Sequence, residues 1–185
     1  GGRPITRNQT LVMNALVEQQ MDFLQAYANI NSKFPEETQR MVTSIVHLMA
    51  WCCIGLNSST EAPAQGLLPL TTALKILAEH EHPMMLDYQL PYVMFLREVY
   101  VVKEEQASDP RNDQGSHETW FLDELWWFVV VRFRDVLIEF NEQYADDDVD
   151  FSLGTFHAYV HFIFDGIVPC VTDFFETCDA KGAEK

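Results

Sequence analysis

The sequence predicts an all-α fold, an antiparallel stack of helices of the armadillo or HEAT-like α-solenoid type. Two observations support this prediction. Five long stretches carry apolar residues at helical spacing, and proline, glycine and polar turns separate them. No segment alternates polar and apolar residues between hairpin turns, so no strand competes with the helices. Helix pairs joined by short loops stack in this manner, although the repeat periodicity here is weak.

The first two helices are expected over residues 8–31 and 35–54. Apolar residues recur close to every third or fourth position in both stretches. Pro35 followed by two glutamates is a favoured start for the second helix. Gly55 follows its last apolar turn, and we expect this glycine to end the helix in the left-handed conformation.

Three shorter elements are expected in the middle of the chain. Ser58, with a glutamate three residues later, has the spacing of a capping box and opens a short helical turn. Pro69 begins a helix that runs to about residue 80. The next helix covers about 84–103, and Pro91 inside it either kinks the helix or divides it into a short turn and a longer helix.

Two long helices complete the prediction, over about 117–144 and 151–178. The polar stretch 104–116, with a proline and a glycine, is interpreted as a flexible loop before them. The first half of 117–144 is apolar nearly all round, which predicts burial on several sides. We therefore expect Trp127 and Phe128 in the core, where replacement by alanine costs about 3–5 kcal/mol. Pro169 is expected to kink the last helix.

Composition and charge exclude several classes of partner. The 185 residues are 48% apolar, enough for a single helical domain over residues 1–185. The formal net charge is −16, and residues 93–185, with 7 basic and 20 acidic side chains, contribute −13 of it. This field repels phosphate backbones, so we expect no nucleic acid partner, and it disfavours anionic membrane surfaces. The acids form either a solvated surface or a surface for a basic partner or for divalent cations.

The cysteines and the apolar runs indicate a reduced, cytosolic segment. Cys52, Cys53, Cys170 and Cys178 lack the spacing of a zinc site and are expected in helix cores. No run reaches 18 uncharged apolar residues, so we expect no direct membrane contact by this segment. Gly1 and Gly2 are typical of a tag remnant, and the sequence is interpreted as a fragment of a larger protein.

One motif between the second and third helices is more specific than the rest. It has the form G-x-N-x-x-T-E, followed by L-L-P-L, and it joins two apolar helices through a polar turn. A His-Glu-His-Pro break, a helix close to Y-x-x-F-L-x-x-x-Y-V and a tryptophan-bearing helix follow in order. The residues concerned are Gly55, Asn57, Thr60, Glu61, Leu67, Leu68, Pro69, Leu70, His80, Glu81, His82, Pro83, Tyr92, Phe95, Leu96, Tyr100, Val101 and Trp120.

In this order the motifs resemble the central cytosolic helical region, an armadillo or RIH-like domain, of the inositol trisphosphate receptor family of calcium-release channels. About 50 residues resemble it well and most of the chain loosely. The loop 104–116 is longer than in the animal receptors, which indicates a divergent, protist homologue. Ryanodine receptors share the wider architecture, but the turn is closer to the inositol trisphosphate receptors.

The resemblance implies a function and a location. The parent protein would be a homotetrameric channel on the cytosolic face of the endoplasmic reticulum or a related calcium-store membrane. This segment would contact neighbouring domains and subunits, and it would relay ligand-induced conformational change to the pore without binding ligand or conducting ions. Packed helical interfaces can do this because they switch between discrete arrangements.

Candidate chemical sites are few. His157, His161 and Asp165 lie four residues apart on one predicted helix, and this set would bind zinc only with a further ligand from another element. Otherwise they form an ordinary polar helix face. The acidic run 146–150 lacks the glycine and glutamate of an EF-hand loop and is interpreted as a helix-terminating turn. The His80–His82 pair is interpreted as a helix C-terminal cap.

The sequence therefore leaves three hypotheses. The first is the channel segment, the second is a stand-alone acidic helical scaffold for protein–protein interaction, and the third is a metal-dependent helical enzyme using the two histidines and the aspartate. No nucleophile elbow, phosphate-binding loop or dinucleotide fingerprint is present in the sequence. We therefore expect no enzymatic activity and no cofactor.

Overall fold

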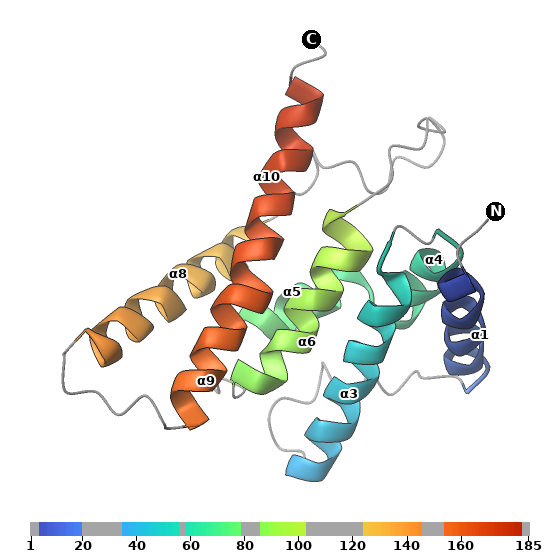
Figure 1. Cartoon of the computed structure of the whole chain (residues 1–185), viewed down its shortest axis with the longest axis horizontal. Coiled ribbons are helices and arrows are strands. Elements are labelled where there is room, and N and C mark those ends of the chain that lie inside the picture. The colour runs from blue at the N-terminus through green and yellow to red at the C-terminus, as the bar shows by residue number, and fades with distance from the viewer. Residues whose placement is uncertain are drawn as a thin grey trace.

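The computed structural model describes residues 4–19, 35–55, 58–78, 86–102, 124–145 and 154–182, and every regular element among them is helical. The all-α prediction is confirmed for this part of the chain. Its elements, shown in Figure 1, are α1 (Pro4–Glu18), α3 (Glu36–Cys53), α4 (Ser58–Leu67), α5 (Leu70–Ala78), α6 (Leu86–Leu96), the π-helix η1 (Arg97–Val101), α8 (Glu124–Tyr144), α9 (Gly154–His161), the π-helix η2 (Phe162–Ile167) and α10 (Val168–Gly182).

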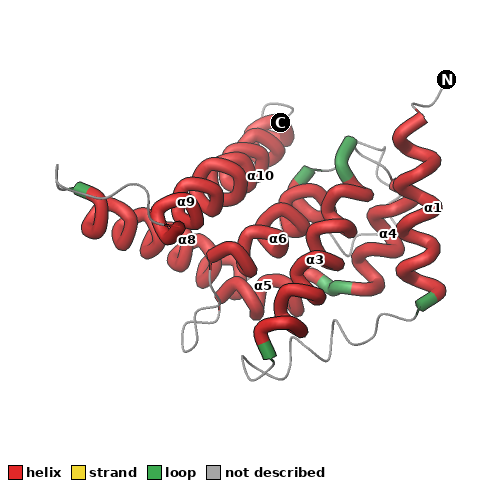
Figure 2. The backbone as a smooth tube through the Cα atoms, turned by 60° about the horizontal axis from the view of Figure 1, so that its bottom comes forward, coloured by secondary structure: helices red, strands yellow, loops and turns green. Residues whose placement is uncertain are grey.

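Three long helical segments lie side by side as one row. They are α3, then α6 with η1, then α9–η2–α10, and they run in the same direction in Figure 1. The helices α5 and α8 pack together as a second layer, with α5 behind α6. Figure 2 shows α1 and α4 at the α3 end of the row and α8, α9 and α10 at the other end. The central position therefore belongs to α6 and η1.

The predicted helix boundaries hold where proline and glycine set them. Pro35 precedes α3, and its carbonyl accepts from the N–H groups of Thr38 and Gln39 at 2.9 and 3.1 Å. Pro69 holds the same position before α5. Gly55 has φ +88°, a left-handed conformation that side chains with a Cβ rarely adopt, and it ends α3 as expected.

Other boundaries differ from the prediction. The predicted short turn after Ser58 is a ten-residue helix with Pro63 inside it. The first helix begins earlier, at Pro4, and the last one runs on to Gly182. Residues 20–34, 79–85, 103–123 and 146–153 lie outside the described residues, and with them the predicted loop 104–116, the His80–His82 cap and the acidic run 146–150.

Two residues of the sequence motif make buried hydrogen bonds at the two ends of α4. The buried hydroxyl of Thr60 donates to the carbonyl of Cys52 at 2.9 Å, in the last turn of α3. The hydroxyl of Tyr100, on η1, donates to the carbonyl of Leu68 at 3.0 Å, just after α4. Carbonyls at a helix C-terminus have no partner within the helix, so these two side chains satisfy groups that would otherwise be buried unpaired. Thr60 and Tyr100 therefore each have a structural role at one end of α4.

Two π-helical stretches interrupt the long helices. In each, a backbone N–H bonds a carbonyl five residues back, from Val102 to Arg97 and from Val168 to Ile163. The second stretch ends two residues before Pro169, so the expected proline kink falls in a region of altered helix winding. Gly166 lies in this stretch, where a Cβ would stand 3.0 Å from the Leu90 Cδ1 atom of α6. The absence of a side chain there lets the two helices approach closely.

The buried apolar side chains form one cluster that extends from α1 to α10. On α8 the buried positions Trp126, Val129, Phe133 and Val136 form a single face. Trp127 and Phe128 lie off this face and are 41% and 45% exposed. Their predicted place in the core is therefore wrong, because α8 packs on one side only and not on several.

Candidate functional site

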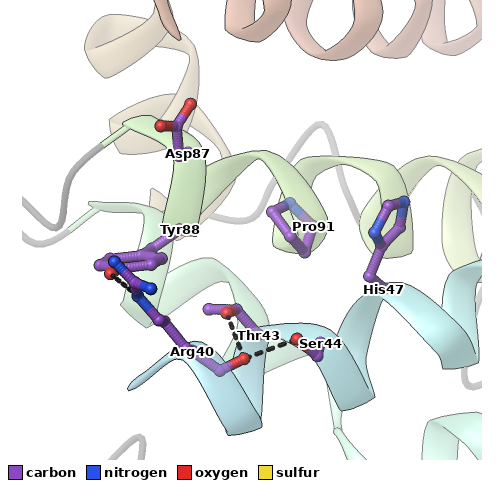
Figure 3. Close-up of a pocket in the computed structure, with 7 residues that line it drawn as sticks. All are labelled: Arg40, Thr43, Ser44, His47, Asp87, Tyr88 and Pro91. Carbon is purple, nitrogen blue, oxygen red and sulfur yellow. Dashed lines mark hydrogen bonds between the residues drawn. The ribbon is translucent and has the colours of Figure 1, made fainter. Parts of the chain in front are cut away.

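An open groove of about 300 Å³ lies between α3 and α6. Figure 3 shows the side chains that line it, and they come from these two helices alone: Arg40, Thr43, Ser44, His47, Asp87, Tyr88 and Pro91. The α3 residues follow one another at helical spacing and so share one stripe. Because Pro91 has no N–H, it donates no hydrogen bond to the carbonyl one turn back, at Asp87 on the same wall.

Charge at one end of the groove is already balanced. Arg40 Nη2 lies 2.6 Å from Glu36 Oε1, and Arg40 Nε donates to the Tyr88 hydroxyl at 3.2 Å. Tyr88 in turn donates to Glu36 Oε1 at 3.3 Å. The hydrogen bonds with Tyr88 and Glu36 raise the pKa of the Arg40 guanidinium. This network links the first turns of α3 and α6 and neutralises the cation, so the groove is not built for an anion.

The other end of the groove contains His47. Its Nε2 atom accepts a hydrogen bond from Trp51 Nε1 at 2.7 Å, one turn further along α3. An imidazole that accepts at this nitrogen is unprotonated there. Partial burial lowers the pKa of His47, which favours the same neutral form.

The serine and threonine hydroxyl groups of the groove point to the backbone. Ser44 donates to the carbonyl of Arg40 at 2.7 Å, and Thr43 donates to the carbonyl of Gln39 at 2.9 Å. An activated serine instead donates to a general base. The groove therefore offers rings, aliphatic stems and hydrogen-bonding edges to a protruding side chain of a partner, and this arrangement suits contact more than catalysis.

The predicted zinc ligands lie on α9 and η2. His161 Nδ1 is 2.7 Å from Asp165 Oδ2, and both side chains are exposed. His157 is exposed one turn earlier, next to the ring of Phe156. Within the described ranges, no three His, Cys, Asp or Glu side chains are placed to hold a metal ion. The pairing of His161 with Asp165 matches the ordinary-helix alternative.

The described cysteines have the predicted place in helix cores. Cys52, Cys53 and Cys170 are buried free thiols. Burial raises the pKa of Cys53 and of Cys170 to about 12. Both are thus protonated at neutral pH and unsuited to nucleophilic chemistry. The side chain of Cys178 lies outside the described residues.

Sequence reasoning missed an ionic cluster between η1 and α10. Arg97 Nε donates to Asp173 Oδ2 at 2.5 Å, and Arg97 Nη1 lies 3.0 Å from Glu98 Oε1. Burial raises the pKa of Glu98 despite the opposing effect of Arg97. Arg97 and Asp173 are 76 positions apart, so no local pattern marks the pair. The cluster joins the centre of the row to its last member.

An ion pair within α8 is linked to α9 by a tyrosine hydrogen bond. Arg132 is buried on α8, and its Nη1 atom lies 3.2 Å from Glu139 Oε1. Tyr159 of α9 donates to the other oxygen of Glu139 at 3.3 Å. The rings of Phe140 and Tyr159, 5.9 Å apart, pack beside this contact. An arginine within an apolar helix was the only signal for it in the sequence.

In the part of the chain that the structure describes, one helix, Gly154–Glu176, is long and apolar enough by composition to cross a membrane, and 33% of its most apolar window is buried inside the fold. Helices of this kind also occur in the cores of soluble proteins, so this finding alone does not place the chain in a membrane. In comparisons with protein-family models, curated proteins and solved structures, no match to this chain was found.

Proposed function

We propose that this chain is an internal segment of a larger helical stack, an α-solenoid of the armadillo or HEAT type, and that it acts by contact with neighbouring segments. The row of co-directional helices with a second layer behind it supports the proposal. In solenoids each helix pair contacts only its neighbours, and the pairs at either end leave apolar faces that must be covered.

The distribution of exposed apolar side chains is the observation that carries the proposal. Among the described residues, every large exposed apolar side chain lies on α1, on or just after α3, on α8 or on α9–η2–α10. The inner elements α4, α5, α6 and η1 carry none of them. At the α3 end they are Leu11, Val12, Val17, Met41, Leu48, Trp51 and Ile54; at the other end they are Trp127, Phe128, Val131, Leu137, Ile138, Phe164, Val168 and Phe175.

Exposed apolar area at both ends indicates contact surfaces. Contiguous apolar patches on a soluble protein mark sites of interaction, whereas single exposed side chains need no explanation. On α3, Met41 and Leu48 are two turns apart and Trp51 follows one turn later, so they share a stripe. The α3–α6 groove, with His47 and Tyr88, opens beside this stripe and adds a recess for a partner side chain.

The resemblance to inositol trisphosphate receptors names a candidate for the larger protein that contains this stack. In the proposal, the segment lies on the cytosolic side of a tetrameric calcium-release channel in the endoplasmic reticulum and relays displacement toward the pore. The motif residues Thr60, Tyr100 and Gly55 have structural roles at the ends of α3 and α4, which agrees with a motif that joins helices. The second candidate, a stand-alone acidic scaffold, is favoured by the net charge of −16.

Two measurements test the proposal. The first is the reading frame around the segment, where a channel predicts a β-rich ligand domain upstream and about six hydrophobic spans of roughly 20 residues downstream. The second is amide hydrogen exchange of this chain against a longer chain from the same reading frame. We expect slower exchange in α1, α3 and α8 of the longer chain and no change in α5 and α6.

The outcomes separate the candidates. A reading frame without membrane spans, together with unchanged exchange at both ends, refutes the channel segment and leaves the acidic scaffold. Slower exchange at the ends without membrane spans retains the helical stack but refutes its place in a channel.

A further inference from the structure

The outer face of α9–η2–α10 carries an apolar stripe that the fold leaves uncovered. Its exposed members are Phe164, Val168 and Phe175, which are 60%, 46% and 49% exposed, and Val171 lies partly exposed between the last two. Spacings of four, three and four residues place them on one line along the helix. The stripe spans twelve residues, about three turns and roughly 16 Å.

The neighbouring face of the same segment, about 100° around the helix from the stripe, is fully occupied. Ile163, Ile167, Cys170 and Phe174 are buried, where η2 packs on α6 and the Phe174 ring lies 4.5 Å from Trp126. An amphipathic helix normally exposes charged and polar residues opposite its buried face. Asp165 and Thr172 occupy that polar face here, but the apolar stripe between it and the buried face is uncovered and is suited to a second partner.

Acidic residues border the stripe. Asp165 directly follows Phe164, Glu176 directly follows Phe175, and both carboxylates are exposed. The sequence from 154 to 176 contains no lysine or arginine, and residues 93–185 carry a net charge of −13. A ligand of this surface must therefore supply both an apolar face and positive charge.

We propose that this stripe, Phe164–Val168–Val171–Phe175 with Asp165 and Glu176 at its edge, is the docking surface for a cationic amphipathic helix. The partner helix places apolar residues at i, i+4, i+7 and i+11 on the stripe and lysines or arginines against the two carboxylates. The inference deepens the proposed function, since it names the charge of the helix that covers this end of the stack. It does not depend on the parent being a channel.

Two other occupants fit the observations less well. A second copy of the chain would bring a like charge of −16 to the same surface, and the two acidic edges would repel. An anionic membrane would repel those edges in the same way. Both enter the test as outcomes that overturn the proposal.

The test uses two synthetic helix-forming peptides of 15 residues, labelled with fluorescein. Both carry leucine at i, i+4, i+7 and i+11; one has lysines beside the leucines and the other has glutamates. Fluorescence anisotropy with the purified chain measures their affinities. We expect the lysine peptide to bind at least about tenfold more tightly, and its binding to weaken with salt.

Variants of the stripe localise the binding. Phe164→Ser and Phe175→Ser should each weaken binding of the lysine peptide at least about tenfold, as loss of an interface anchor does. The matched control is Leu11→Ser on α1, equally exposed at 59% and at the other end of the stack, which should change the affinity less than twofold.

The charge of the stripe is tested separately. The double variant Asp165→Asn with Glu176→Gln should weaken binding and lower its salt dependence. Glu18→Gln on α1 is the matched control for charge and should change neither quantity. Since all these side chains are exposed, the variants should keep the circular dichroism spectrum of the parent. The double variant keeps the test valid even where a serine variant fails to fold.

Several results would overturn the inference. They are equal affinities for the two peptides, an affinity unaffected by either phenylalanine variant, a dimer in sedimentation that Phe164→Ser dissociates, and binding of the chain to vesicles of phosphatidylcholine with phosphatidylserine that the same variant abolishes. None of them bears on hydrogen exchange at α1 and α3, so the proposed function is tested apart from this surface.

Discussion

Two adjacent tryptophans on α8 provide the sharpest test of the packing. Trp126 is 1% exposed and stacks on Phe174 at a ring distance of 4.5 Å, whereas Trp127 is 41% exposed. A tryptophan buries up to about 250 Å², and at about 25 cal/mol per Å² its full burial contributes about 6 kcal/mol. Alanine retains part of this area, and we expect Trp126→Ala to cost about 3–5 kcal/mol of unfolding free energy.

Trp127→Ala should cost less than about 2 kcal/mol. Its side chain faces solvent on one side, so water fills the space that alanine leaves and no closed cavity forms. The free energy of unfolding is measured by urea titration with circular dichroism, with the slope m required to stay constant across the variants. In thermal melts, the loss at Trp126 corresponds to about 6–20 °C for a chain of this length.

Trp126→Ala and Trp127→Ala are matched variants, because both replace a tryptophan by alanine and their positions differ by one residue. Equal losses in both variants, or a loss below about 1 kcal/mol for Trp126→Ala, would show that the side of α8 that packs on the fold is assigned wrongly. The exposed apolar face of α8, on which the proposed function depends, would then be wrong too.

Three further predictions follow from the centre of the fold. Gly166→Val should destabilise the chain by about 1–3 kcal/mol in a urea titration, because even a Cβ stands 3.0 Å from Leu90 Cδ1; unchanged stability would contradict the close approach of η2 and α6. Burial raises the pKa of Glu98 above its ordinary 4.5, so the native state binds more protons than the unfolded state and stability should fall as pH rises through and above 4.5; melts of Glu98→Gln should lack this part of the decline, and parallel pH profiles would refute it. Cys53 and Cys170, with pKa values of about 12, should resist iodoacetamide at pH 8 in the native state and react in urea, as read by mass spectrometry; modification of both in the native chain would contradict their burial.

The sequence predicted helices wherever local chemistry decides them. Pro35, Gly55 and Pro69 mark boundaries through backbone geometry alone, and the structure has them within one or two residues of the predicted positions. The side of α8 that packs on the fold was not predictable in this way. Its apolar residues surround the helix, so periodicity does not distinguish Trp126 from Trp127, and only the positions of α5 and α10 decide between them.

Contacts between residues far apart in the chain could not be predicted from the sequence. Arg97 and Asp173 meet because η1 packs against α10. No local sequence pattern around either residue predicts that they pair. The groove between α3 and α6 depends likewise on the pairing of two helices some 50 residues apart, shown by the bond between Tyr88 and Glu36. By contrast, the pairing of His161 with Asp165 was predictable, because a spacing of four residues on one helix suffices.

The middle of the row decides whether the stack can carry displacement from one end to the other. The segment formed by α6 and η1 contacts α3 on one side and η2 and α10 on the other, so the proposed relay would run through it. Two features stiffen this route: the Arg97–Asp173 ion pair, and the close approach at Gly166 that leaves no space between the helices. A segment that served only as a spacer between its neighbours would need neither the ion pair nor the close approach, since it would only have to keep its two ends apart. A relay needs both ends to bias one shared element, and α6 with η1 is the element in this fold that occupies that position.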